Sequence, residues 1–154
     1  ILDNILYDVE LFFEEGKSLK IKALLDTGNE LRDPLTGTPV LIVEEKAALQ
    51  FLPEKICRFL QMPWRESSNP WSYIWNDEDY GLTKMVFISA QGINGQSWLP
   101  GIRLGKVKII QGEKEWEQPV TVALVSQALS ADNQFQALLH PEHIHKTACK
   151  EEIA

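Results

Sequence analysis

The segment "ALLDTGN", residues 23–29, places an acidic side chain directly after an apolar run. Asp26 supplies a carboxylate, Thr27 supplies a hydroxyl, and Gly28 has no side chain to keep backbone N–H groups at a distance. A carboxylate held in such a loop can act as a general base toward water. The alternative interpretation is an ordinary Asx-turn. We take Asp26 as the candidate catalytic residue, with Thr27 and Gly28 supporting its loop.

One carboxylate is half of a hydrolytic site. Peptide hydrolysis by carboxylates needs two of them about 3 Å apart that share one proton, because two like charges this close cannot both ionise. The ionised one activates water, and the protonated one polarises the scissile carbonyl. The chain contains no second Asp-Thr-Gly and no Asp-Ser-Gly. The second half must therefore come from an identical chain across a two-fold axis.

The C-terminal segment "HPEHIHKTAC" contains residue types that bind zinc. They are His140, His143, His145 and Cys149. Their spacing matches no zinc pattern and Pro141 interrupts any helix, so we expect a polar tail, no metal site and no cofactor. A phosphate-binding glycine loop, a G-x-S-x-G elbow and an H-E-x-x-H motif are all absent.

Residues 64–80 are rich in aromatic side chains. Trp71, Tyr73 and Trp75 recur at period two, which predicts one face of a strand packed on the core. Alternatively, this aromatic loop is a docking surface, since Trp and Tyr concentrate in recognition hot spots. A second function therefore stays open, in which the chain is a non-catalytic β-domain that binds a protein partner through residues 64–80.

Composition limits the class of protein. The 154 residues are 44% hydrophobic and 24% charged, which fits one globular domain. A net charge of −7 without a basic cluster argues against nucleic acid as a partner. The chain has no apolar run of about 20 residues for a membrane span and starts at Ile1. We expect residues 1–154 to be one cytosolic domain excised from a longer protein.

The elements that would position Asp26 are mostly strands. Period-two apolar residues predict a β-hairpin over residues 5–23, and "VLIVE" predicts a strand. Residues 44–62 have helical spacing, which Pro53 splits into two short helices. Asp132 is expected to cap a last helix, "NQFQALLH". Three more strands are expected in "KMVFISA", "IRLGKVKII" and "QPVTVALVS", which together give a closed or sandwich-like β fold with about three short helices.

"ALLDTGN" on the second strand of a short β-rich domain resembles the retropepsin-like aspartic proteases, which are homodimers with one motif per subunit. A longer resemblance, to the protease domain of the sporulation sigma-E factor-processing peptidases, runs through "LLDTGNELRDPLTGTPVLIVE", "VFISAQGINGQSWLPGIRLG" and "VTVALVSQALS". It implies a retropepsin-like closed β-barrel with half a site per subunit. Asp26 matches the catalytic aspartate of these enzymes, and Thr27 and Gly28 match their loop-supporting pair.

The resemblance also implies partners and a location. The substrate would be a sigma factor precursor whose pro-sequence is removed, and a signal protein from the forespore would activate the enzyme. A missing N-terminal region would anchor the protein to a membrane. The protease domain would then lie on the cytosolic face, on the mother-cell side of the sporulation septum.

A flap that closes over the substrate is a further feature of retropepsin-like enzymes. The best candidate is "SAQGINGQSW" with Gly92, Asn94 and Gly95. Glycines around a tip permit positive φ and a mobile lid, although an ordinary hairpin turn has the same composition.

The chain departs from the retropepsin pattern in one element. These enzymes usually have a second apolar-apolar-Gly strand followed by a helix with an arginine, and "VALVSQALSADNQFQ" has the strand and helix pattern without either residue. Arg32 or Arg103 is expected to substitute by pairing with Glu30.

Overall fold

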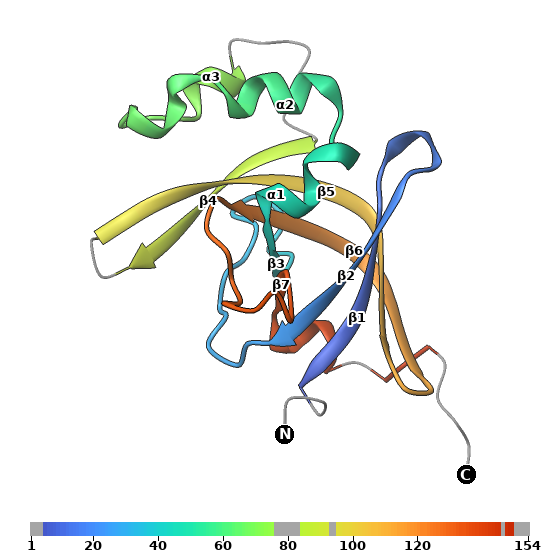
Figure 1. Cartoon of the computed structure of the whole chain (residues 1–154). Helices are drawn as coiled ribbons and strands as arrows, with labels where there is room; N and C mark the ends of the chain where they lie inside the picture. Colours follow the sequence, from blue (N-terminus) through green and yellow to red (C-terminus); the bar gives the residue numbers. More distant parts are fainter. Residues whose placement is uncertain (1–4, 76–83, 93–94, 146, 150–154) are drawn as a thin grey trace.

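The structure is a computed structural model that describes residues 5–75, 84–92, 95–145 and 147–149 (Figure 1). Asn94 of the candidate flap and Tyr80 of the aromatic loop lie outside the described residues. The side chain of Trp75 is also outside the description.

Six strands form a closed barrel, as expected from the sequence (Figure 1). Each strand pairs with the next around the ring, and the last pairs with the first. In spatial order they are β1 (Leu6–Phe12), β2 (Ser18–Leu25), β7 (Ala137–Leu139), β3 (Val40–Glu44), β6 (Lys114–Val125) and β5 (Gly95–Gln111). The seventh strand, β4 (Met85–Gly92), pairs with β5 outside the ring.

The predicted N-terminal hairpin is confirmed and leads the chain into the candidate site. β1 and β2 are antiparallel, and their alternating apolar residues, such as Leu11 and Ala23, point into the core. A 3-10 turn, η2 (Glu14–Gly16), joins them with Gly16 at a φ of 72°. The end of β2 therefore delivers Asp26 to one end of the barrel.

The prediction of a last helix capped by Asp132 is wrong. The segment instead forms β7, which runs parallel to β2 and antiparallel to β3. Asn133 has a φ of 56°, which interrupts helical geometry, and the Asp132 carboxylate accepts a hydrogen bond from the Ser130 hydroxyl. The gap between β2 and β3 offers hydrogen bonds on both sides, and these outweigh local helix propensity.

A helical layer lies above the β4–β5 pair in Figure 1. The predicted break at Pro53 is confirmed, because Pro53 is the N-cap of the longest helix. The layer comprises α1 (Glu45–Ala48), η3 (Leu49–Phe51), α2 (Glu54–Leu60), η4 (Pro63–Glu66) and α3 (Ser72–Trp75). No helix of the described residues is long and apolar enough to cross a bilayer.

The aromatic rings of this layer belong to the core. The prediction of a strand face at residues 71–75 is wrong, because a turn at Pro70, whose carbonyl accepts from the Tyr73 N–H, leads into α3. Trp64 is only 1% exposed and contacts Phe87 of β4 at 5.2 Å between ring centroids. Trp71 is half-buried against the same ring. These two tryptophans are therefore engaged in packing.

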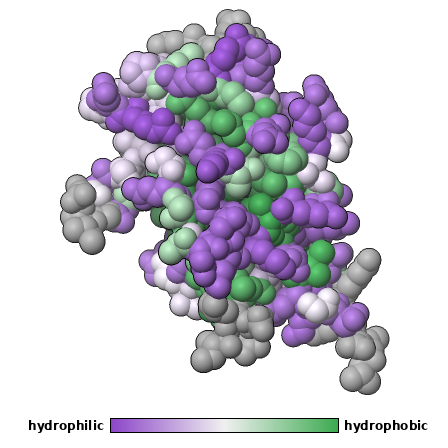
Figure 2. Space-filling model, in the orientation of Figure 1, coloured by the Kyte–Doolittle hydropathy of each residue, from purple (hydrophilic) through white to green (hydrophobic). Residues whose placement is uncertain are grey.

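Polar residues cover most of the face seen in Figure 2, and hydrophobic residues show between them in its middle. Of the described large hydrophobic side chains, Leu35 and Leu49 are the exposed ones. Leu35 lies in the segment between Asp26 and β3.

Candidate active site

Asp26 follows the last residue of β2 and begins a tight turn. Its backbone N–H donates to the Leu139 carbonyl at the end of β7, with 3.1 Å between the two atoms, and its own carbonyl accepts from the Asn29 N–H at 3.0 Å. The side chain is partly exposed rather than sealed by packing atoms. The loop is therefore held by its backbone while the carboxylate remains accessible.

Gly28 lies directly against the Asp26 carboxylate. The Gly28 N–H donates to Oδ1 of Asp26 at 3.0 Å, and a Cβ at position 28 would lie 3.4 Å from the same oxygen. Thr27 is exposed, and its hydroxyl makes no hydrogen bond within the part of the chain described. Within this chain, Gly28 supports the carboxylate directly and Thr27 is left at the surface.

Asn29 is a supporting residue that the motif did not reveal. Its side chain is buried, with Nδ2 donating to the Val40 carbonyl at 2.9 Å and Oδ1 accepting from the Leu31 N–H at 3.0 Å. The amide thus ties the Asp26 turn to the start of β3. A buried amide that satisfies one donor and one acceptor is well suited to fix a loop.

A buried ion pair anchors the rest of the loop. Nε and Nη2 of Arg103 donate to the two carboxylate oxygens of Asp33 at 2.7 and 3.0 Å, and the Thr121 hydroxyl donates to Oδ2 at 2.9 Å. Burial alone would raise the pKa of Asp33. The hydrogen bonds from Arg103, the Leu35 N–H and Thr121, together with the Arg103 charge, outweigh burial and lower this pKa to about 2.

The predicted pairing of Glu30 with Arg32 or Arg103 is wrong. Arg103 reaches Asp33 instead, and Nη2 of Arg32 lies 2.5 Å from a carboxylate oxygen of Glu142. Each arginine pairs with an acidic side chain far from it in the sequence, and no local pattern identifies such a partner.

A second element braces the loop from the side of β7. The turn η5 (Pro141–His143) follows β7, and Nδ1 of His143 accepts from the His140 N–H at 3.1 Å. Nε2 of His143 donates to the Pro39 carbonyl at 3.3 Å. Leu139 therefore hydrogen-bonds Asp26 at the start of the loop, and His143 hydrogen-bonds Pro39 at its end. We call these two contacts, from β7 and η5, the β7–η5 clasp.

The strand expected in "VALVSQALSADNQFQ" is the end of β6, which pairs with β3 and β5, whereas β7 pairs with β2. The expectation of a polar tail at the histidine-rich segment is wrong for its first part, because His140 and His143 are buried around η5. Nδ1 of His140 accepts from the Glu142 N–H, and burial lowers the pKa of this histidine. The described residues contain no group of three side chains placed to bind a metal.

The candidate flap forms the end of the β4–β5 hairpin. Gly92 pairs with Gly95, and Gly95 has a φ of 98°, a conformation that favours glycine. In Figure 1 the hairpin projects beyond the barrel toward the left, the side on which the loop after β2 also lies. The structure thus brings Asp26, Thr27 and Gly28 together in one turn and places Gly92 and Gly95 on a separate projecting hairpin.

Known proteins match this chain over nearly its whole length. The profile of the peptidase U4 family, described as "Sporulation factor SpoIIGA", matches residues 1–143. The sporulation sigma-E factor-processing peptidase of Priestia megaterium is 28% identical over 141 residues, 90% of this chain and 44% of that protein. The Bacillus subtilis protein of the same name is 28% identical over 139 residues, 88% of this chain and 43% of that protein.

A probable sporulation sigma-E factor-processing peptidase of Clostridium acetobutylicum is 29% identical over 139 residues, 90% of this chain and 42% of that protein. The chain thus spans less than half the length of these three relatives. No solved structure matches it significantly. Because the family profile covers the barrel, the Asp26 loop and η5, this chain belongs to the SpoIIGA family of sporulation factors.

Proposed function

We propose that this chain is the protease domain of a sporulation sigma-E factor-processing peptidase, and that it hydrolyses a peptide bond in the pro-sequence of a sigma factor precursor. The observation that carries the proposal is the Asp26 turn. It combines an accessible carboxylate, a backbone donor at 3.0 Å and a loop gripped at both ends. The names of the relatives support the substrate class.

The active unit is a homodimer in this proposal. A single chain has one Asp-Thr-Gly, and catalysis needs two carboxylates about 3 Å apart. Thr27 and Gly28 are exposed beside Asp26, so a second copy can approach this loop without displacing packed side chains. A two-fold axis through this surface makes the contact self-complementary and brings the two Asp26 side chains face to face.

The chemistry follows from the shared proton. The ionised Asp26 removes a proton from water while the water oxygen attacks the scissile carbonyl carbon, and the protonated Asp26 of the other copy donates to the carbonyl oxygen. In the resulting neutral gem-diol, the first Asp26 carboxyl donates its proton to the amide nitrogen, the other Asp26 carboxylate takes up a hydroxyl proton, and the C–N bond breaks to give a carboxylic acid and an amine. All of these proton transfers use Asp26 carboxyls, so no cofactor or metal enters the proposal.

The β4–β5 hairpin is the flap in this proposal. Gly92, Asn94 and Gly95 form the tip that lowers over the substrate and excludes water. The outer edge of β4 has no partner among the described strands, so it offers backbone groups to an extended peptide. This favours a substrate segment without secondary structure of its own.

The setting of the domain is part of the proposal as well. In this proposal a segment outside residues 1–154 anchors the protein to the membrane, as the resemblance to these peptidases implies. The domain then lies on the cytosolic face, at the mother-cell side of the sporulation septum, where a signal protein from the forespore activates it. This places the enzyme beside a cytosolic sigma factor precursor.

Coexpression of the full-length protein with a sigma-E precursor tests the proposal. Asp26→Asn keeps the size of the side chain but removes the general base, so processing should fall by about 100-fold or more. The matched control is Asp132→Asn, which alters an exposed aspartate bonded to Ser130 and should leave processing unchanged. Normal processing by Asp26→Asn would contradict the aspartic mechanism.

A further inference from the structure

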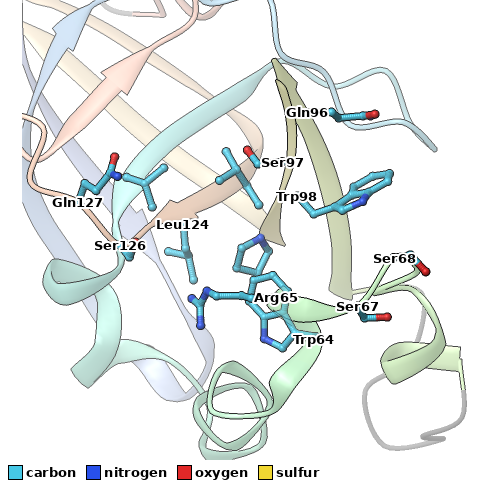
Figure 3. A pocket seen from close by; sticks show the side chains of 13 residues that line it. Trp64, Arg65, Ser67, Ser68, Gln96, Ser97, Trp98, Leu124, Ser126 and Gln127 are labelled. Atoms are coloured by element: carbon cyan, nitrogen blue, oxygen red, sulfur yellow. The ribbon is translucent and has the colours of Figure 1, made fainter. Parts of the chain in front are cut away.

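A cavity of about 520 Å³ lies between the helical layer and the β4–β5 hairpin (Figure 3). Three elements build it, namely η4 with the residues after it, the part of β5 next to the candidate flap tip, and the end of β6 with the residues that follow. Asp26 is not among its lining residues. We call this space the η4 cavity.

The lining of the η4 cavity is polar and has one charge. Six of its thirteen residues are serine or glutamine, namely Ser67, Ser68, Gln96, Ser97, Ser126 and Gln127. Among the residues that the structure describes, Arg65 is the one charged lining residue, and no described aspartate or glutamate lines the cavity. The whole chain has a net charge of −7, so a cavity whose described lining has one cation, several neutral polar side chains and no anion differs in charge from the domain as a whole.

Arg65 is held in place but retains donors. Its guanidinium lies 4.4 Å from the centre of the Trp64 ring, Nη1 donates to the Leu60 carbonyl at 3.2 Å, and Nη2 lies 3.4 Å from a Glu45 oxygen. A guanidinium has five N–H groups, so these contacts orient the group without exhausting it. The side chain is 47% exposed, which leaves it accessible to a ligand.

The position of the cavity connects it with the proposed cleft. Gln96, Ser97 and Trp98 belong to the hairpin strand that begins at Gly95 of the candidate flap. The cavity and the candidate flap thus share the β4–β5 hairpin, and this shared hairpin is the link between the cavity and the proposed cleft. Nothing else in the described chain fills the space.

We propose that the η4 cavity is an accessory subsite of the protease, which takes an acidic side chain of the substrate polypeptide at a position away from the scissile bond. The inference rests on the proposed function and adds a specificity determinant to it. Arg65 pairs with the substrate carboxylate, the neighbouring serines and glutamines donate hydrogen bonds, and Trp98 contacts the substrate backbone or an apolar neighbour.

Peptide binding to the full-length Asp26→Asn protein provides the test, because this readout does not depend on cleavage. The probes are fluorescein-labelled decapeptides copied from the cleavage region of the precursor, in which each position in turn is Glu or Gln. At one position the Glu peptide should bind about tenfold more tightly than the Gln peptide at low salt. Equal affinities at every position would overturn the proposal.

Variants of Arg65 assign the effect to the cavity. In an Arg65→Gln background the preference for Glu should disappear, and in Arg65→Glu the same position should prefer Lys. The control is Arg58→Gln, an exposed arginine of α2 that does not line the cavity, and it should retain the preference. A Glu preference that survives Arg65→Gln would place the acid-binding group elsewhere and overturn the assignment.

Two features keep the outcomes separable. Each variant is compared with itself on two peptides, so a partly unfolded preparation lowers both affinities and leaves their ratio intact. The proposed function fails if Asp26→Asn still processes the precursor, whereas the subsite fails if the affinity ratios are flat. Either result can occur without the other.

Discussion

Two aspartates of one loop have opposite environments, and this contrast assigns their roles. Asp33 is 1% exposed and surrounded by Arg103, Thr121 and backbone donors, so its charge is fully compensated. Asp26 is partly exposed, and Oδ1 accepts one backbone hydrogen bond from Gly28. A compensated carboxylate stabilises the fold, whereas an accessible one can react with water.

Replacing Asp33 should destabilise the protein strongly. Asp33→Asn leaves the Arg103 charge without its partner in a site where Arg103 is 17% exposed, so the free energy of unfolding should fall by about 3 kcal/mol. Urea denaturation measures this change. The control is Asp8→Asn, because the Asp8–Lys22 pair is exposed and should contribute less than about 1 kcal/mol. Equal effects of the two substitutions would contradict the assigned role of Asp33.

The same carboxylate predicts a pH dependence. The pKa of Asp33 is lowered from 3.8 in the unfolded chain to about 2 in the folded one. Its contribution to stability is therefore complete above pH 3.8 and is lost as the pH falls through about 2. Urea midpoints measured between pH 5 and pH 2 should fall less steeply for Asp33→Asn than for the wild type. Parallel curves would show that other groups determine acid unfolding.

Sequence reasoning reached Asp26 because its motif is contiguous and its chemistry is readable from three adjacent residues. Arg103 and Asp33 are 70 positions apart, and no local pattern links them. The role of Asn29 could not be predicted for a different reason. A polar residue after Asp-Thr-Gly resembles an ordinary surface residue, and only the structure shows that its amide bonds the Val40 carbonyl.

At the scale of elements, the β7–η5 clasp is the support that the Asp26 loop depends on. Leu139 and His143 reach the two ends of the loop, while Glu142 pairs with Arg32 between them. A short strand with a 3-10 turn thus replaces the helix with an arginine that the resemblance implied. The support comes from backbone and imidazole hydrogen bonds together with an exposed ion pair.

Removing the His143 ring tests the clasp. His143→Ala leaves the His140 N–H and the Pro39 carbonyl without partners in a buried region, so stability should fall by about 2 kcal/mol. Precursor processing should fall as well, even at temperatures where the variant is folded, because the Asp26 loop loses one anchor. His145→Ala alters an exposed histidine of the same segment and should change neither property. Full activity of folded His143→Ala would separate the clasp from catalysis.

The flap assignment makes a prediction for Gly95. Alanine at this position has free space around its Cβ but must adopt a φ of 98°, so Gly95→Ala should strain the hairpin tip and lower kcat/KM for the precursor. The stability cost should stay near about 1 kcal/mol, since no packing is lost. Gly105→Ala, in the same strand with free space and without the positive φ, is the matched control. Unchanged kcat/KM in Gly95→Ala would argue for an ordinary turn.

The elements that sequence predicted correctly are those whose signal is local. Alternating apolar residues identified β1 and β2, and Pro53 identified the break before α2. β7 has a helical composition and becomes a strand only because β2 and β3 leave a gap of matching length. The turn before α3 similarly overrides the period-two pattern of Trp71 and Tyr73.

At the scale of the molecule, closure of the barrel leaves few strand edges free to pair with another chain. Six strands satisfy each other around the ring, while β4 keeps an edge free among the described strands. The Asp26 turn lies at one end of the barrel with Thr27 and Gly28 exposed beside it. In the proposed mechanism one chain supplies half of the catalytic site, and the fold could be anticipated from the sequence more fully than this assembly.

Mixing wild-type and Asp26→Asn chains tests the shared site most directly. The full-length proteins are co-folded at constant total concentration and ionic strength, since residues 1–154 have a net charge of −7 and like charges repel at low salt. If two Asp26 carboxylates form one site, an equal mixture should process precursor at about one quarter of the wild-type rate, because about a quarter of random dimers contain two intact copies. A rate of about one half would mean that each chain acts alone, and it would contradict the account.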